Sequence, residues 1–393
     1  MALISSAPSV PVGAIFQKAS GTAPSSPVEG QTYYDSSSDR LFVYDGTSWK
    51  DTSDPHAETF NHTNTSGITG RLILIAGGGP GGGRPSGSYG TESGGGAGGV
   101  LNLGGIIFAT STNYTVAIGP GGADNNTING WMTKGGDTTC IGTGVYLTAY
   151  GGGEGCAEYK KKGAYFGEYH ANRTGMGNGR TMDGTANFRV GSAGGGDNTR
   201  FQGIVPGTPG QGTRGGMRDN ADTHYSSYSA AGFDANWAGK GGGGAGAHGL
   251  PGDKGSPWPN SGCAQTYGGY GGTGVNLTNW VGSVGSFSGS FAGGGGGSGY
   301  ENCSGTPQGG VGVHGGGSWN NSGSANHGGG GGAKDGTPGS GPGGSGGSGR
   351  IFLIVPTSTS VSFSNITQSS STVNSLSVYD ITATTPTATF SMT

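Results

Sequence analysis

Runs of consecutive glycine constrain this chain more than any other feature of its sequence. Glycine supplies 95 of the 393 residues, while 30% are hydrophobic and 10% charged, so side chains alone cannot build a core along the whole length. Such a composition is typical of low-complexity disorder. The scarce charge and the 35 aromatic residues (16 Tyr, 13 Phe and 6 Trp) oppose that interpretation, because disordered chains are usually highly charged and poor in aromatics. We therefore expect a folded protein that is held together largely by its backbone.

The uneven distribution of glycine divides the chain into three parts. Few glycines precede residue 70, and none follows Gly349. We predict an extended lead and a small β-meander over 1–69, which is too short for an independent core and should dock on a neighbour or on copies of itself. A glycine-rich domain with exposed loops should occupy 70–355. The Ser/Thr-rich tail, 356–393, alternates in polarity and predicts short half-buried strands that either cap the domain or mediate self-association.

The glycine runs of the middle part, such as Gly241 to Gly244 and Gly293 to Gly297, recur at irregular spacing. A run of this kind can form a polyglycine-II helix, with three residues per turn and no internal hydrogen bonds. Because glycine has no Cβ, several such helices can approach closely and satisfy one another's backbone groups. The predicted fold class is all-β and irregular, with polyglycine-II-type helices packed with β-strands and essentially no α-helix. A collagen triple helix is excluded, since glycine at every third position lasts only from Gly249 to Pro257.

Two apolar runs bracket the glycine-rich part, Leu72 to Ile75 and Ile351 to Ile354. Continuous apolar runs are typical of strands that are buried on both faces, so we predict that these two lie side by side and close the domain. Further strands are expected at 100–103 with 106–108, at 114–118 and at 145–150.

The amino-terminal part carries turn and strand signals of its own. Asp45-Gly46 predicts a two-residue hairpin turn, because glycine takes positive φ at little cost. In the meander around this turn, one face is expected to carry Tyr34, Leu41, Val43 and Trp49.

Charge and cysteine usage exclude several function classes. A net charge of −3 and a pI near 6.1 give no electrostatic footprint for nucleic acid. The first residues lack a basic start with an apolar stretch, and no run is long enough for membrane insertion, so we expect neither a signal peptide nor a membrane span. The isolated cysteines lack metal-ligand spacing; free thiols are favoured over one or two disulfides, which stay open, for Cys140, Cys156, Cys263 and Cys303. No cofactor and no metal site are predicted.

Two catalytic or nucleotide motifs have simpler explanations. Residues 72–82 match a strand followed by Gly-x-Gly-x-x-Gly, but the next residues cannot form the helix that a dinucleotide site needs. Glu154, Glu158 and Glu168 can cluster on one loop, yet nothing sets a separation between their carboxylates. We predict that the chain is not an enzyme, and a depolymerase is the catalytic alternative that merits a test.

Recognition, if the chain has it, is expected in the long loops, because a glycine lattice presents few side chains. Flat rings beside polar groups are typical of sugar- and protein-binding surfaces. The candidate receptor contacts are Tyr159, Lys161, Tyr165, Phe166, Tyr169, His170, Tyr225, Tyr228, Trp237 and Trp258, with Tyr267, Tyr270, Trp280 and Trp319 as further candidates. The alternative is that these rings cover lattice edges or subunit contacts.

Two stretches resemble known phage proteins. Residues 27–35 and 41–50 look like a short module of bacteriophage tail-fibre and appendage proteins. The middle is similar to glycine-rich domains that begin with an apolar strand before Gly-Gly-Gly and end with Gly-Gly-Ser-Gly and another apolar strand. More distantly, it resembles the polyglycine receptor-binding adhesin of T-even phages, although its runs are less regular.

This resemblance implies a structural virion fibre that is located on the outside of the particle and mediates attachment to the host surface. It further implies a homotrimer that joins other virion proteins through its amino-terminal segment and contacts a bacterial surface protein or glycan through loops. The alternatives are a purely structural capsid or tail decoration without receptor binding, and an extracellular filament protein.

Overall fold

The computed structural model describes residues 17–19, 23–25, 27, 31–35, 40–44, 49–51, 60–83, 92–123, 133–155, 178–179, 188–195, 210–216, 240–250, 253–254, 265–284, 286–301, 309–334 and 341–393. The chain forms two compact units, Met1–Glu58 and Thr59–Thr393. The boundary lies eleven residues before the predicted one at residue 69/70, because β5 already belongs to the second unit.

The first unit contains a four-stranded sheet in the order of the sequence: β1 (Gln17–Ala19), β2 (Thr32–Asp35), β3 (Arg40–Tyr44) and β4 (Trp49–Asp51). β3 and β4 pair antiparallel, as the hairpin prediction requires, while the turn residues 45–48 lie outside the described residues. Trp49 lies opposite Tyr44, and its ring contacts buried Tyr33 edge-on at 4.6 Å. Because successive strand residues alternate between faces, Trp49 belongs to the face of Tyr33, and its predicted place beside Tyr34 is wrong.

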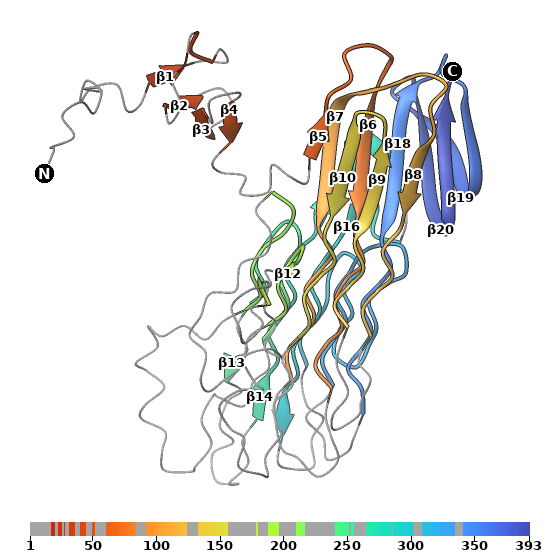
Figure 1. Cartoon of the computed structure of the whole chain (residues 1–393). Helices are drawn as coiled ribbons and strands as arrows, with labels where there is room; N and C mark the ends of the chain where they lie inside the picture. Colours follow the sequence, from red (N-terminus) through yellow and green to blue (C-terminus); the bar gives the residue numbers. More distant parts are fainter. Residues whose placement is uncertain are drawn as a thin grey trace, which may run out of the picture. The chain divides into compact units, whose positions relative to one another are not determined.

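A nine-stranded sheet organises the second unit (Figure 1). Eight strands follow the order β5-β10-β9-β8-β20-β18-β6-β7, and β19 pairs with β20. Their bounds are β5 Phe60–His62, β6 Ile68–Ile75, β7 Val100–Phe108, β8 Tyr114–Ala117, β9 Thr138–Gly142, β10 Val145–Ala149, β18 Arg350–Pro356, β19 Val361–Val373 and β20 Leu376–Met392. The sheet is therefore built from strands that flank the glycine-rich segments in the sequence.

The two apolar runs form β6 and β18, which pair antiparallel with Leu72 opposite Leu353. This confirms the prediction that they lie side by side. Both faces of the pair are buried: Leu72 and Leu74 pack into one hydrophobic cluster, and Ile73 and Ile75 into a second one. Central strands with two buried faces require the continuous apolar runs that the sequence contains.

The carboxyl-terminal tail forms longer strands than predicted. β19 and β20 make a hairpin of 13 and 17 residues around Asn374 and Ser375, both at positive φ. β20 also pairs with β18 and β8, so the tail is part of the main sheet. The alternating patches seen in the sequence are pieces of these strands, and the Ser- and Thr-rich stretches between them continue the ladder.

Helix is almost absent from the described chain. One turn, α1 (Thr278–Val281), packs on the second hydrophobic cluster through Val281. The remaining strands are short pairs and a triplet: β11 Asn178–Gly179, β12 Phe188–Arg189, β13 Asp253–Lys254, β14 Gln265–Tyr267, β15 Val275–Asn276, β16 Ser290–Phe291 and β17 Tyr300–Glu301. The predicted fold class is confirmed. None of the helices in the described ranges is long and apolar enough to cross a membrane.

Glycine-rich segments continue from the strands and run side by side beyond the sheet (Figure 1). Their backbone groups bond to neighbouring segments in a pattern with a period of three, which segment 92–99 shows most clearly. The N–H groups of residues 94 to 99 donate, in order, to the carbonyls of Lys240, Gly331, Gly153, Gly243, Gly328 and Tyr150, at 2.8 to 2.9 Å. Every third amide thus returns to the same neighbour, as a helix with three residues per turn requires.

The carbonyls of this segment accept from further segments, so the segment is surrounded. Gly79 and Ser192 donate to Gly96 and Ala97, and Gly295 donates to Gly95. The close approach depends on glycine: a Cβ on Gly95 would overlap the carbonyl oxygens of Gly79 and Pro80. A lattice of backbone hydrogen bonds therefore holds the glycine-rich region together, and it satisfies polar groups that would otherwise be buried without partners.

Candidate functional site

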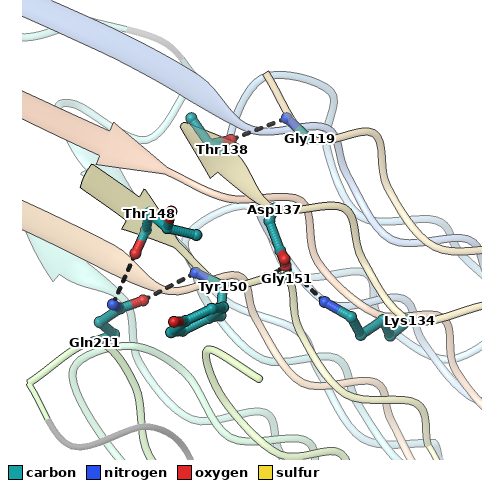
Figure 2. Close-up of polar contacts among 8 residues, drawn as sticks. All are labelled: Gly119, Lys134, Asp137, Thr138, Thr148, Tyr150, Gly151 and Gln211. Atoms are coloured by element: carbon teal, nitrogen blue, oxygen red, sulfur yellow. Dashed lines mark hydrogen bonds and ion pairs between the residues drawn. The ribbon is translucent and has the colours of Figure 1, made fainter. Parts of the chain in front are cut away.

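A seam of polar side chains joins the sheet to the glycine lattice (Figure 2). Buried Thr138 accepts from the Gly119 amide and donates to the Ile75 carbonyl, both at 2.9 Å. Buried Gln211 accepts from the Tyr150 amide at 2.9 Å and donates to the Thr148 carbonyl at 3.0 Å. These side chains provide hydrogen-bond partners for backbone amides and carbonyls at the transition from strand to lattice. At this point the two-residue period of the strand changes to the three-residue period of the lattice.

Asp137 completes this seam, because its Oδ1 accepts from the Gly151 amide at 2.8 Å and from Lys134 Nζ at 2.6 Å. Each of these polar groups is engaged with backbone or with a counter-charge (Figure 2). The described residues also contain no group of three or more His, Cys, Asp or Glu side chains that could hold a metal ion. The polar side chains of the seam are therefore used for bonds within the fold. Candidate residues for recognition are found elsewhere.

Chain direction gives the lattice one end that is remote from the sheet. Segment 76–83 leaves the sheet after β6, and segment 92–99 returns to it before β7. The ends of these two segments near residues 83 and 92 are therefore farther from the sheet, and we call this end of the lattice the distal end. By their hydrogen-bonded neighbours, the described residues that flank 124–132, 217–239, 302–308 and 335–340 also lie at the distal end.

The ten candidate receptor contacts all fall in three connections, and all lie outside the described residues. Tyr159, Lys161, Tyr165, Phe166, Tyr169 and His170 follow Gly155; Tyr225, Tyr228 and Trp237 precede Lys240; and Trp258 lies between β13 and β14. Gly155 and Lys240 are lattice residues at distal positions, since Gly155 donates to Pro80 and the Lys240 carbonyl accepts from Gly94. The structure does not test whether these side chains come together.

A row of exposed side chains with a period of three is present among the described residues. Along 267–273, Tyr267, Tyr270 and Thr273 are exposed, and the pairs of glycines between them are buried. Three residues per turn at about 3.1 Å rise place consecutive members of such a row roughly 9 Å apart on one side of a polyglycine-II helix. The sequence signal for this row is the repeat Tyr-Gly-Gly-Tyr-Gly-Gly-Thr. Its three-residue period marks an edge of the lattice, which was not predicted from the sequence.

Neighbouring segments extend this row sideways. The Leu250 amide donates to the Tyr270 carbonyl at 2.9 Å, and the Gly271 amide donates to the Val311 carbonyl at 3.0 Å. Leu250 and Val311 are 51% and 45% exposed, beside 40% for Tyr267 and 52% for Tyr270. We call Leu250, Tyr267, Tyr270 and Val311 the edge patch. The edge patch presents flat rings and aliphatic groups. The backbone N–H of Tyr270 donates to no acceptor among the described residues.

Trp280 and Trp319, the other candidates, are not members of the edge patch, although Trp319 bonds to the residue next to Val311. Trp280 on α1 is 38% exposed, and the Arg71 guanidinium lies 3.5 Å from its ring centroid. Asn102 holds the same guanidinium through a 2.6 Å hydrogen bond from Nη1. Trp319 is half-buried, and its amide donates to Gly310.

Cys140 is a buried free thiol on β9, and burial raises the pKa of this thiol far above its ordinary value. Its state agrees with the expectation of free thiols, while Cys156, Cys263 and Cys303 lie outside the described residues.

Comparison of the chain with protein-family models, with curated proteins and with solved structures gives no match in any of the three.

Proposed function

We propose that the chain is a structural fibre protein of a bacteriophage particle, a tail fibre or similar appendage, that contacts the host surface at the distal end of its glycine lattice. The observation that carries the proposal is the topology of the lattice. Segments that are bonded through their backbones on several sides form a stiff support, and Gly155 and Lys240, which border two aromatic-rich stretches of the sequence, occupy distal lattice positions. Binding residues are disproportionately found on loops that a rigid scaffold positions.

The edge patch supports contact with a surface rather than with a small substrate. Tyrosine rings combine a large apolar face with a polar hydroxyl, and they are enriched where proteins bind other macromolecules. In this proposal the amino-terminal unit joins other virion proteins, the protein is located on the virion surface, and neither catalysis nor a cofactor is involved.

Immunogold labelling of phage particles from the natural host tests the location. Antibodies against residues 1–58 and against the second unit should both label an appendage of the particle. Label on open-ended filaments outside particles would favour the extracellular filament, and absence of label from particles would refute the proposal.

A binding assay tests attachment. The purified chain should bind host cells, and the double substitution Tyr267→Ser with Tyr270→Ser should weaken binding about tenfold or more, since two aromatic contacts are lost. Tyr146→Ser is the matched control, because Tyr146 is 48% exposed on β10 of the sheet. If neither variant alters binding, the edge patch is not the contact; if the wild-type chain does not bind host cells, the purely structural decoration is favoured.

A further inference from the structure

We infer that the outer edge of β19 is an interaction surface for a second copy of this chain, with the two β19 strands paired antiparallel across a two-fold axis. The inference concerns assembly: two paired chains take the place of the homotrimer that the resemblance implies, and the inference holds whichever surface the protein binds.

β19 lies at the border of the main sheet and pairs there only with β20 among the described strands (Figure 1). At 13 residues it is far longer than β5, the three-residue strand at one end of the strand order. A strand in this position presents a row of N–H and C=O groups that can pair with another chain.

Of the usual protections of an edge strand, β19 carries only irregularities of register, at Ser364/Ile366 and Thr367/Gln368. Its sequence, Val361 to Val373, contains no charged residue and no proline. Natural edges are commonly blunted by lysine, proline, an inward-pointing charge or a short strand. The one charged residue of the hairpin 361–392 is Asp380, which is buried and ion-paired with Arg350. Two copies can therefore approach along β19 without like-charge repulsion.

The stretch Gln368–Thr372 has the most regular pairing with β20 within β19. Register shifts with β20 occur before it, at Ser364/Ile366 and Thr367/Gln368, whereas from Gln368 onward the pairing is regular. All five residues of the stretch are exposed, although their partners on β20 are largely buried. Among the described strands, only β20 pairs with this stretch, so its outer edge is open to a second strand.

A second β19 is the occupant that the chemistry favours. Antiparallel pairing of identical strands is self-complementary, because a contact of one residue with a second across the axis is repeated as a contact of the second with the first. Pairing centred on Ser370 would align the hydroxyl side chains of Ser369, Ser370 and Ser371, and Ser and Thr pairs across strands can form hydrogen bonds. Main-chain hydrogen bonds provide the affinity in strand addition of this kind.

The test measures the mass of the purified full-length chain by light scattering over a hundredfold dilution. Wild type should reach the mass of two chains. Ser370→Lys should weaken the dimer about tenfold or more, because like charges opposite each other are destabilising. Ser370→Glu should weaken it similarly, and an equimolar mixture of the two variants should restore the mass of two chains.

Thr115→Lys is the matched control, because Thr115 is exposed on β8, which has paired strands on both sides. This variant should dimerise like wild type, and melting temperatures should show that all variants are folded. A monomeric wild type, a mass of three chains, or a Ser370→Lys dimer as strong as wild type would each overturn the inference.

Discussion

The guanidinium of Arg350 on β18 forms a two-pronged ion pair with the carboxylate of Asp380 on β20. Nε donates to Oδ1 at 2.6 Å, and Nη2 donates to Oδ2. Both residues are buried, and the guanidinium also lies 5.1 Å from the Phe352 ring centroid. A buried pair with good geometry couples the two strands, and it makes each partner dependent on the other.

Breaking this pair from one side should destabilise the protein strongly. Asp380→Asn leaves the Arg350 charge buried without its counter-ion, which typically costs about 3–5 kcal/mol. The free energy of unfolding from urea titration measures the effect. The double variant Arg350→Met with Asp380→Leu should be much closer to wild type, and a single variant with wild-type stability would contradict the expectation.

Two adjacent glycines test the need for close approach in the lattice. A Cβ on Gly152 would overlap the Gly96 carbonyl oxygen, whereas a Cβ on Gly153 comes no nearer than 3.2 Å, to the amide nitrogen of Gly194. Gly152→Ala should therefore cost about 2 kcal/mol or more through overpacking, and Gly153→Ala less than about 1 kcal/mol. Thermal unfolding compares the pair, and equal losses would show that the close spacing between segments is not decisive.

Acid should weaken the fold through His327. The imidazole is buried beside Phe291, its Nδ1 lies 2.8 Å from the Ala325 carbonyl, and burial lowers its pKa below the ordinary 6.5. Nearby Arg350 lowers the pKa further, and Asp380 opposes this change. Because the folded state favours the neutral ring, the unfolded state binds a proton at higher pH than the folded state does. The contribution of His327 to the free energy of unfolding is therefore complete above about pH 6.5 and declines as pH falls through the lowered pKa.

Melting temperatures of wild type and His327→Phe between pH 7.5 and pH 4.5 measure this effect. The aromatic replacement keeps a ring beside Phe291 without a titrating group. Wild type should lose more of its melting temperature than the variant over this range, and parallel pH profiles would show that His327 does not contribute.

Cys140 should be unreactive in the native protein. Its thiol is buried, and burial raises its pKa, so the reactive thiolate is scarce at neutral pH. Peptide mass spectrometry after iodoacetamide treatment should find Cys140 unmodified in buffer and modified in denaturant. Rapid native labelling would mean that β9 opens readily.

Several parts of this fold could be predicted from the sequence because their signals are local. The runs around Leu72 and Ile351 required buried central strands, and the glycine runs required partners outside themselves, since such helices have no internal hydrogen bonds. The three-residue repeat from Tyr267 to Thr273 is a local signal too, but its meaning, the outer side of a lattice segment, was not predicted.

Other features depend on contacts between distant residues. Gln211 gives no sequence sign that it completes the backbone bonding of Thr148 and Tyr150, and Arg350 gives none that it pairs with Asp380. The length of β19 was underestimated, because a run of serines is a poor strand signal until β20 supplies the ladder. The candidate loop residues from Tyr159 to Trp258 stay predictions.

Hydrogen exchange of the glycine amides tests the backbone lattice most directly. Amides 94 to 99 and 330 to 333 should exchange as slowly as those of β6 and β18, because they are buried and bonded between segments. Exchange at the rate of an unstructured chain in these segments, beside protected strands, would show that the glycine runs are solvated and that the lattice does not hold the molecule together.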